Sequence, residues 1–247
     1  MGLGFVGGAV MHGFRPRGTL ANDQERLLLL VVPLAVASES WIAIEPTRVC
    51  RSLLLRGFVA LSSGPLLMLG GVYLTGEASG WSPSERAFLL LAVGALILIP
   101  WLMLATRQQR GLDPTISLSL AATSLAVGIT TILSGYGSAR QLALPLAAVV
   151  AATAFAGTAV GGPRSPEAVG VGWICLAGIL FIARLFGSLT SLYAVLLGAT
   201  PLGCWLAVCR PLSSWPGWPR RLVILGLTLL MLGSVAGSMQ YYVDFGR

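Results

Sequence analysis

The chain has 247 residues, of which 55% are hydrophobic and only 10% are charged, whereas a soluble domain is about a quarter charged. Its mean hydropathy of +0.83 therefore argues against a water-soluble protein and indicates a chain that is buried in a lipid bilayer. The net charge of +7 comes from 16 arginines with no lysine, and these lie at the ends of apolar runs and form no basic face, so we expect no nucleic-acid partner.

The first 14 residues are apolar and rich in glycine, but they lack the basic start and the cleavage pattern of a signal peptide. As a helix they would reach about 21 Å, short of the roughly 30 Å hydrocarbon core of a bilayer. We expect a short interfacial or partly inserted helix here. A ninth span that continues upstream is the alternative.

Eight apolar runs of about 20 residues follow, which is the length that a helix needs to cross a bilayer. Turn-rich separators divide them, and one of these contains Ser82 and Pro83 in a pattern typical of a helix start. The boundary near Arg184 is the least marked, and we expect a tight helical hairpin there, because a single helix from Ala168 to Cys209 would be about 63 Å long. The runs are Leu27–Ile44, Ser52–Thr75, Ala87–Thr106, Thr115–Ser134, Gln141–Gly161, Ala168–Ala183, Leu189–Cys209 and Leu222–Met239.

These runs predict an all-α fold, a polytopic transmembrane helical bundle of about eight spans plus a short N-terminal helix. No separator is long enough to form a soluble domain, so residues 1–247 are expected to form a single transmembrane domain. The predicted location is the cell membrane, with several passes through it, and the arginine-only, alanine-rich composition favours the inner membrane of a GC-rich bacterium.

Two opposite charges lie at matching depths of the first predicted hairpin. Glu39 precedes the end of the first run and Arg56 follows the start of the second, so the two can meet in an antiparallel pair. An ion pair is the least costly way to hold both charges in a membrane, and we expect a structural pair that fixes the hairpin. An ion or proton site at Glu39 is the alternative.

A polar turn, Ser134-Gly135-Tyr136-Gly137, follows the fourth run. Its Gly135-Tyr136-Gly137 core resembles the selectivity filter of potassium channels, which uses rings of backbone carbonyls from four such loops. Because this turn links two full-length runs, a glycine-rich turn with Tyr136 at the interface is the preferred interpretation. Together with residues 141–147, this stretch resembles uncharacterised multi-pass membrane proteins of GC-rich bacteria. That resemblance implies several packed spans and no known activity.

The fifth run is rich in small side chains at four-residue spacing, which allow two helices to approach closely. We expect internal packing here, and contact with a second copy or another membrane protein is the sharper alternative. The residues concerned are Ala147, Ala151, Gly157 and Gly161.

Sequence motifs for chemistry are missing. The single histidine is His12, and the four cysteines form no C-x-x-C pair, so we expect no catalytic, metal or cofactor site and no enzyme. A structural or accessory subunit of a membrane assembly is the expected function. The alternative is a transporter or permease-like protein for a small neutral or lipophilic solute, which the prolines inside the runs and hydroxyl-rich stretches such as Ser117–Ser124 favour.

Overall fold

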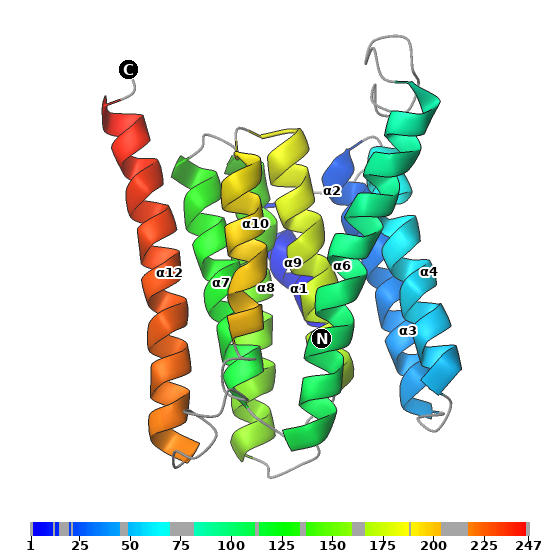
Figure 1. The fold of residues 1–247 in the computed structure, drawn as a ribbon, viewed down its shortest axis with the longest axis horizontal. Helices are drawn as coiled ribbons and strands as arrows, with labels where there is room; N and C mark the ends of the chain where they lie inside the picture. Colours follow the sequence, from blue (N-terminus) through cyan, green and yellow to red (C-terminus); the bar gives the residue numbers. More distant parts are fainter. Residues whose placement is uncertain are drawn as a thin grey trace.

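The computed structural model describes residues 2–11, 13–14, 20, 22–44, 49–69, 82–111, 114–133, 137–159, 166–187, 189–203 and 217–245. Within these ranges the chain is all-α, without a strand, and its helices stand side by side as a bundle (Figure 1). The elements are α1 (Gly2–Met11), α2 (Asp23–Arg26), the π-helix η1 (Leu27–Val31), α3 (Val32–Ile44), α4 (Val49–Met68), α6 (Pro83–Gly111), α7 (Pro114–Leu133), α8 (Gly137–Ala159), α9 (Pro166–Leu185), α10 (Ser191–Ala199) and α12 (Gly217–Phe245).

Each of the eight predicted apolar runs is helical over most of its described part, while residues 70–75 of the second run and 204–209 of the seventh lie outside the described residues. The expected hairpin near Arg184 is present, because α9 ends at Leu185, α10 begins at Ser191, and the two helices pack against each other. Arg184 donates a hydrogen bond from Nε to Oγ of Ser191 over 2.7 Å, which ties the two ends of this turn together. The start of α6 is also as predicted, since Ser82 and Glu85 exchange reciprocal hydrogen bonds ahead of Pro83.

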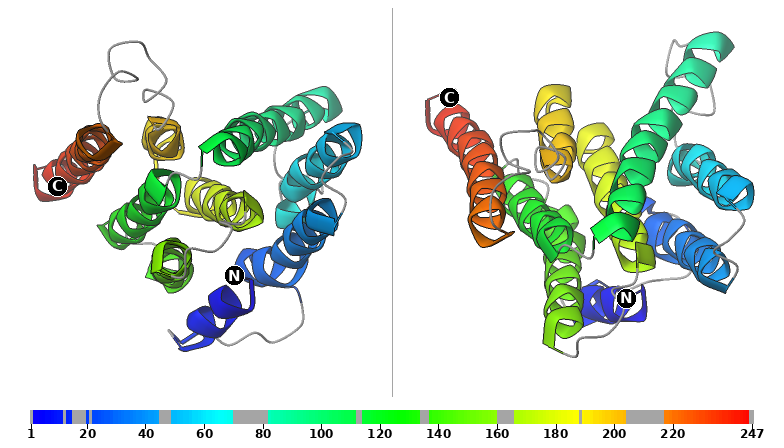
Figure 2. Two further views of the ribbon diagram at one scale, coloured as in Figure 1. Left: turned by 90° about the horizontal axis from the view of Figure 1, so that it is seen from below. Right: turned by 60° about the horizontal axis from the view of Figure 1, so that its bottom comes forward.

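Helix α9 lies at the centre of the bundle, as the view along the helices shows (Figure 2). It packs against α3, α4 and α6 on one side and against α7, α8 and α10 on the other. Of the most apolar 18 consecutive residues in each stretch, 72% are buried in Ala168–Leu185 of α9, compared with 22% in Pro83–Thr106 of α6. The packing of the two groups of helices therefore depends largely on α9.

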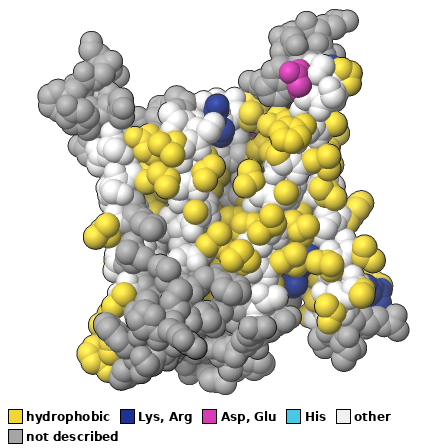
Figure 3. Space-filling model, viewed as in Figure 1, with side chains coloured by type: hydrophobic (Ala, Val, Ile, Leu, Met, Phe, Trp, Pro, Cys, Tyr) yellow, Lys and Arg dark blue, Asp and Glu magenta, His cyan; other side chains and the backbone are white. Residues whose placement is uncertain are grey.

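Three helical stretches are long and apolar enough to cross a membrane, namely Asp23–Ile44, Pro83–Thr106 and Ala168–Leu185. Large apolar side chains also lie on the outside of the bundle, those of α6 among them (Figure 3). Phe88, Leu91, Leu96 and Ile99 of α6 are all more than half exposed, and they recur at the helical spacing that places them on one face. An apolar outer face of this kind is suited to contact with lipid.

The N-terminal helix α1 packs into the bundle. Phe5 and Ala9 are almost fully buried, and α1 packs against α8. The two helices come close at Gly8, where a Cβ atom would lie 2.9 Å from Cβ of Pro145. At 10 residues, α1 is about 15 Å long, which is about half of the bilayer core.

Prolines inside the predicted runs have different effects. The helices α4, α6 and α8 continue through Pro65, Pro100 and Pro145. Pro33 is instead the second residue of α3, just after the π-helix η1, and π-turns of this kind are rare irregularities that often occur at functional sites. Pro201 lies in a 3₁₀ turn that follows α10.

Candidate functional site

The most polar buried feature of the first hairpin is the ion pair between Glu39 of α3 and Arg56 of α4. Nε and Nη2 of Arg56 donate to Oε1 and Oε2 of Glu39 over 2.8 and 2.9 Å. This two-point geometry is the strongest that a guanidinium and a carboxylate can adopt. Only 1% of Glu39 and 4% of Arg56 is exposed. Water therefore does not solvate these two charges, and each of them is stabilised mainly by the other.

The hairpin geometry explains why these two residues meet. Glu39 lies five residues before the end of α3 at Ile44, and Arg56 lies seven residues after the start of α4 at Val49. At about 1.5 Å per residue, both side chains are about 8 to 10 Å from the connection between the two helices. The contact that the sequence predicts is therefore present in the structure.

Two further helices complete the cluster around Glu39. Trp101 of α6 is fully buried and donates from Nε1 to Oε1 of Glu39 over 2.9 Å, while its ring lies beside the guanidinium of Arg56, with the carbon Cζ 5.9 Å from the ring centre. On α9, Gly170 faces the same group, and a Cβ atom there would lie 2.6 Å from Oε1 of Glu39. We call Glu39, Arg56, Trp101 and Gly170 the α9 cluster.

Sequence reasoning missed Trp101 and Gly170, although one signal was available. A tryptophan inside an apolar run carries one N–H group that needs an acceptor when it is buried, and Glu39 is the buried carboxylate of the same set of runs. Gly170 has no comparable signal, because its role comes only from the close approach of α9.

The arrangement favours a fixed charge pair. Oε1 of Glu39 accepts two hydrogen bonds and Oε2 accepts a third. A carboxylate that carries a proton or an ion must change partners, and here both oxygens of Glu39 are already occupied by donors from Arg56 and Trp101. The chemistry of the α9 cluster is therefore suited to holding four helices together.

A second buried polar group lies at the other end of the same hairpin. Gln24, Glu25 and Arg26 are each at least 93% buried. Arg26 donates from Nη1 to the carbonyl oxygen of Leu67 over 3.2 Å and from Nε to that of Leu20 over 2.9 Å. A cation at the end of α4 also interacts favourably with the helix dipole, so Arg26 closes this end of the hairpin.

The buried polar side chains of α7 are hydroxyls that bond within their own helix. Thr123 and Ser124 donate to the carbonyl oxygens of Ser119 and Leu120, each over 2.8 Å. Such bonds back to the preceding turn satisfy a hydroxyl inside a helix. Ser119 also lies 3.4 Å from the hydroxyl of Thr228 on α12, which makes it the polar link to that outer helix.

The remaining predicted positions are distributed as follows. Ser134, Gly135 and Tyr136 lie outside the described residues, and Gly137 is the first residue of α8.

On α8, Ala147 is 8% exposed and Ala151 is half-buried against the core. Gly157 belongs to α8, and Gly161 lies outside the described part. Internal packing thus uses Ala147, while Ala148 and Ala152 on the neighbouring face are exposed.

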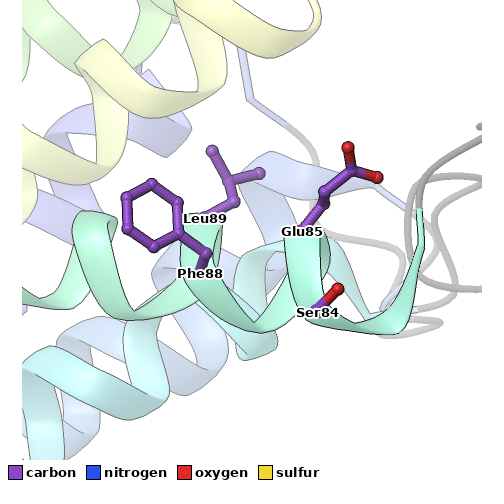
Figure 4. Close-up of a pocket in the computed structure, with 4 residues that line it drawn as sticks. All are labelled: Ser84, Glu85, Phe88 and Leu89. Atoms are coloured by element: carbon purple, nitrogen blue, oxygen red, sulfur yellow. The ribbon is translucent and has the colours of Figure 1, made fainter.

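An open pocket of about 420 Å³ lies at the start of α6 and is lined by Ser84, Glu85, Phe88 and Leu89 (Figure 4). All four side chains come from one helix. Glu85 already serves the helix start, because its Oε2 accepts hydrogen bonds from the backbone N–H and the hydroxyl of Ser82. Among the described lining residues, the one charged side chain of the pocket is therefore already engaged in the helix cap.

Among the described residues, no group of three or more His, Cys, Asp and Glu side chains could hold a metal ion. Comparison with protein-family models, with curated proteins and with solved structures gives no match to this chain.

Proposed function

We propose that the chain is a multi-pass protein of a bacterial inner membrane, in which the eight apolar runs are spans, and that it acts as a structural or accessory subunit of a membrane assembly. The spans are supported by the helices found in the described part of each run and by the exposed apolar face of α6. A membrane is the solvent in which such a face is stable.

The structural role is supported mainly by one observation, that both carboxylate oxygens of Glu39 in the α9 cluster are already hydrogen-bonded within the protein. Its carboxylate accepts three hydrogen bonds from Arg56 and Trp101, and the α7 hydroxyls Thr123 and Ser124 bond to their own helix. The described buried polar groups thus serve packing, and packing is what a subunit without its own chemistry requires.

The proposed partner contact lies on α8. Ala148, Ala152 and Ala156 are exposed and recur every four residues, next to the exposed ring of Phe155. Helices in membranes associate through small side chains at this spacing, because their backbones can come close. The partner is a second copy of the chain or another membrane protein that presents a complementary helix.

Site-specific crosslinking in intact membranes tests this function. A photoreactive side chain at Ala152 should give one defined crosslinked product, whereas the same group at Leu229, which is exposed on α12, should give none. A monomer without a crosslink from either position would contradict the proposal.

One observation favours a second function, transport of a small neutral or lipophilic solute. The π-helix η1 and Pro33 interrupt regular α-helical bonding in the first run, and such irregular turns are frequent where a helix moves or binds. Flux of uncharged solutes into liposomes that contain the purified protein would support transport, and tight liposomes would argue against it.

A further inference from the structure

The helix α4 differs from its neighbours in how well it suits a membrane. It has 20 residues, all of them described, yet it is not among the helices that are long and apolar enough to cross a membrane. Its two arginines, Arg51 and Arg56, explain this difference, because an arginine near the middle of a span is costly to insert. The preceding stretch Asp23–Ile44 does have the required length and hydropathy.

Arg56 is the arginine that needs a partner inside the bundle. It is 96% buried, whereas Arg51 is only half-buried and lies near the start of α4, with its guanidinium 4.9 Å from the ring centre of Trp41. An arginine stacked on a tryptophan at a helix end suits the membrane interface. Arg56 has instead the carboxylate of Glu39, only 17 residues away along the chain.

We infer that α3 and α4 enter the membrane as one hairpin, with Glu39 as the intramolecular counter-ion that allows α4 to insert. A bidentate pair presents a nearly neutral unit to the bilayer, so the pair removes the main obstacle in α4. Trp101 and Gly170 are 62 and 131 residues further along the chain than Glu39. They join the pair when the inserted helices assemble.

Buried charge in the described chain is confined to this hairpin. The buried charged residues are Glu25, Arg26, Glu39 and Arg56, which belong to the α2, α3 and α4 segments and comprise two acids and two bases. The buried polar side chains of α7 and α12, and that of Thr200 just after α10, are hydroxyls, which a helix can satisfy by itself. Among the described residues, the need for insertion with paired charges is therefore limited to the first hairpin.

This inference rests on the proposed multi-pass arrangement, and cysteine labelling of the full chain in sealed vesicles tests both. Cys50 is exposed at the start of α4, and S84C provides a thiol at the start of α6. Two single-cysteine chains are made. The first carries C175A, C204A and C209A and keeps Cys50, and the second carries the same substitutions together with C50A and S84C. A membrane-impermeant maleimide then reports the side on which each end of α4 lies.

In the otherwise unchanged chain, Cys50 and S84C should be labelled from opposite sides. In E39L, the fraction of S84C labelled from the same side as Cys50 should rise several-fold, because Arg56 has lost its counter-ion. The double variant E39L/R56L should restore opposite-side labelling, because α4 then has no deep charge.

The outcomes separate the two proposals. Labelling of both thiols from one side in the otherwise unchanged chain would overturn the multi-pass arrangement. Opposite-side labelling in E39L, equal to that of the parent chain, would overturn the hairpin inference alone. If E39L fails to accumulate, recovery of E39L/R56L with the parent topology supports the inference, and failure of that variant to recover overturns it.

Discussion

Gly170 of α9 lies so close to Glu39 of α3 that a methyl group on Gly170 would be 2.6 Å from Oε1 of the carboxylate and 2.5 Å from Nε1 of Trp101. The central helix can therefore approach the buried ion pair only because this position has no side chain. Gly178, two turns further on, lies against the side chain of Leu27 in η1, where a Cβ atom would overlap it. The first run thus meets α9 at two glycines, Gly170 beside α3 and Gly178 beside η1.

The variant G170A should lower the free energy of unfolding by about 1–3 kcal/mol, because the added methyl group overpacks a polar contact that cannot move away. The measurement is the unfolding temperature of the purified protein in detergent. G57A is the matched control, since a Cβ atom at Gly57 of α4 meets nothing within 4 Å. Equal unfolding temperatures for G170A and G57A would contradict the close approach of α9.

The variant W101F should destabilise the protein more than W173F. Trp101 donates to a charged carboxylate over 2.9 Å, and Trp173 donates to the neutral carbonyl oxygen of Ile97 over 2.8 Å. A hydrogen bond to a charged group contributes about 1.5–3 kcal/mol and a neutral one about 0.5–1.5 kcal/mol.

Both tryptophans are almost fully buried, so the two variants lose the same buried ring area. The difference between their unfolding free energies therefore reflects whether the lost acceptor is charged or neutral. Thermal unfolding in the same detergent measures it. A larger loss in W173F would show that Trp101 does not hold the carboxylate.

The variant G8A should loosen the packing of α1 on α8, because the new methyl group would lie 2.9 Å from Cβ of Pro145. G7A is the control on the next residue, where a Cβ atom meets nothing within 4 Å. We expect a lower unfolding temperature in G8A than in G7A, by roughly 2–4 °C for each kcal/mol lost. The reverse order would place α1 away from α8.

Removal of the cap at Ser82 should fray the start of α6 without unfolding the bundle. In S82A, the backbone N–H of Glu85 loses the hydroxyl that accepts its hydrogen bond over 3.3 Å. Hydrogen exchange at the first turn of α6 should become faster, while exchange in α9 stays unchanged. S84A is the control for loss of a neighbouring hydroxyl, because Oγ of Ser84 lies 3.0 Å from Oγ of Ser82 but accepts no backbone hydrogen bond among those described. Unchanged exchange in S82A would show that this cap is not formed.

The sequence was sufficient to predict that the described part of each run is largely helical, because apolar length and turn residues are local properties. It was also sufficient for the Glu39–Arg56 contact, since the two helices are adjacent in the chain and their depths follow from the rise per residue. The position of α9 at the centre was not predictable in the same way. Its hydropathy resembles that of Asp23–Ile44, and only the packing of distant helices distinguishes them.

Packing between helices also decides details that sequence patterns did not indicate. The spacing of small residues in α8 predicted internal packing, which Ala147 and Ala151 show, but it gave no sign that Gly8 allows α1 to approach α8. Likewise, the π-turn at Leu27–Val31 has no local signal other than the proline that follows. Such features depend on how two helix surfaces fit, which a single run of sequence does not contain.

A double-mutant cycle on the ion pair tests most directly whether the α9 cluster is a structural clamp. We predict that E39Q and R56M each lose about 3–5 kcal/mol of unfolding free energy, because each leaves one buried charge without its partner. The double variant E39Q/R56M should lose much less unfolding free energy than the sum of the two single losses, because neither charge is then left unpaired and the two sites are strongly coupled. If E39Q unfolds at the same temperature as the unaltered protein, or if the two losses simply add, the pair of Glu39 and Arg56 does not hold these helices together.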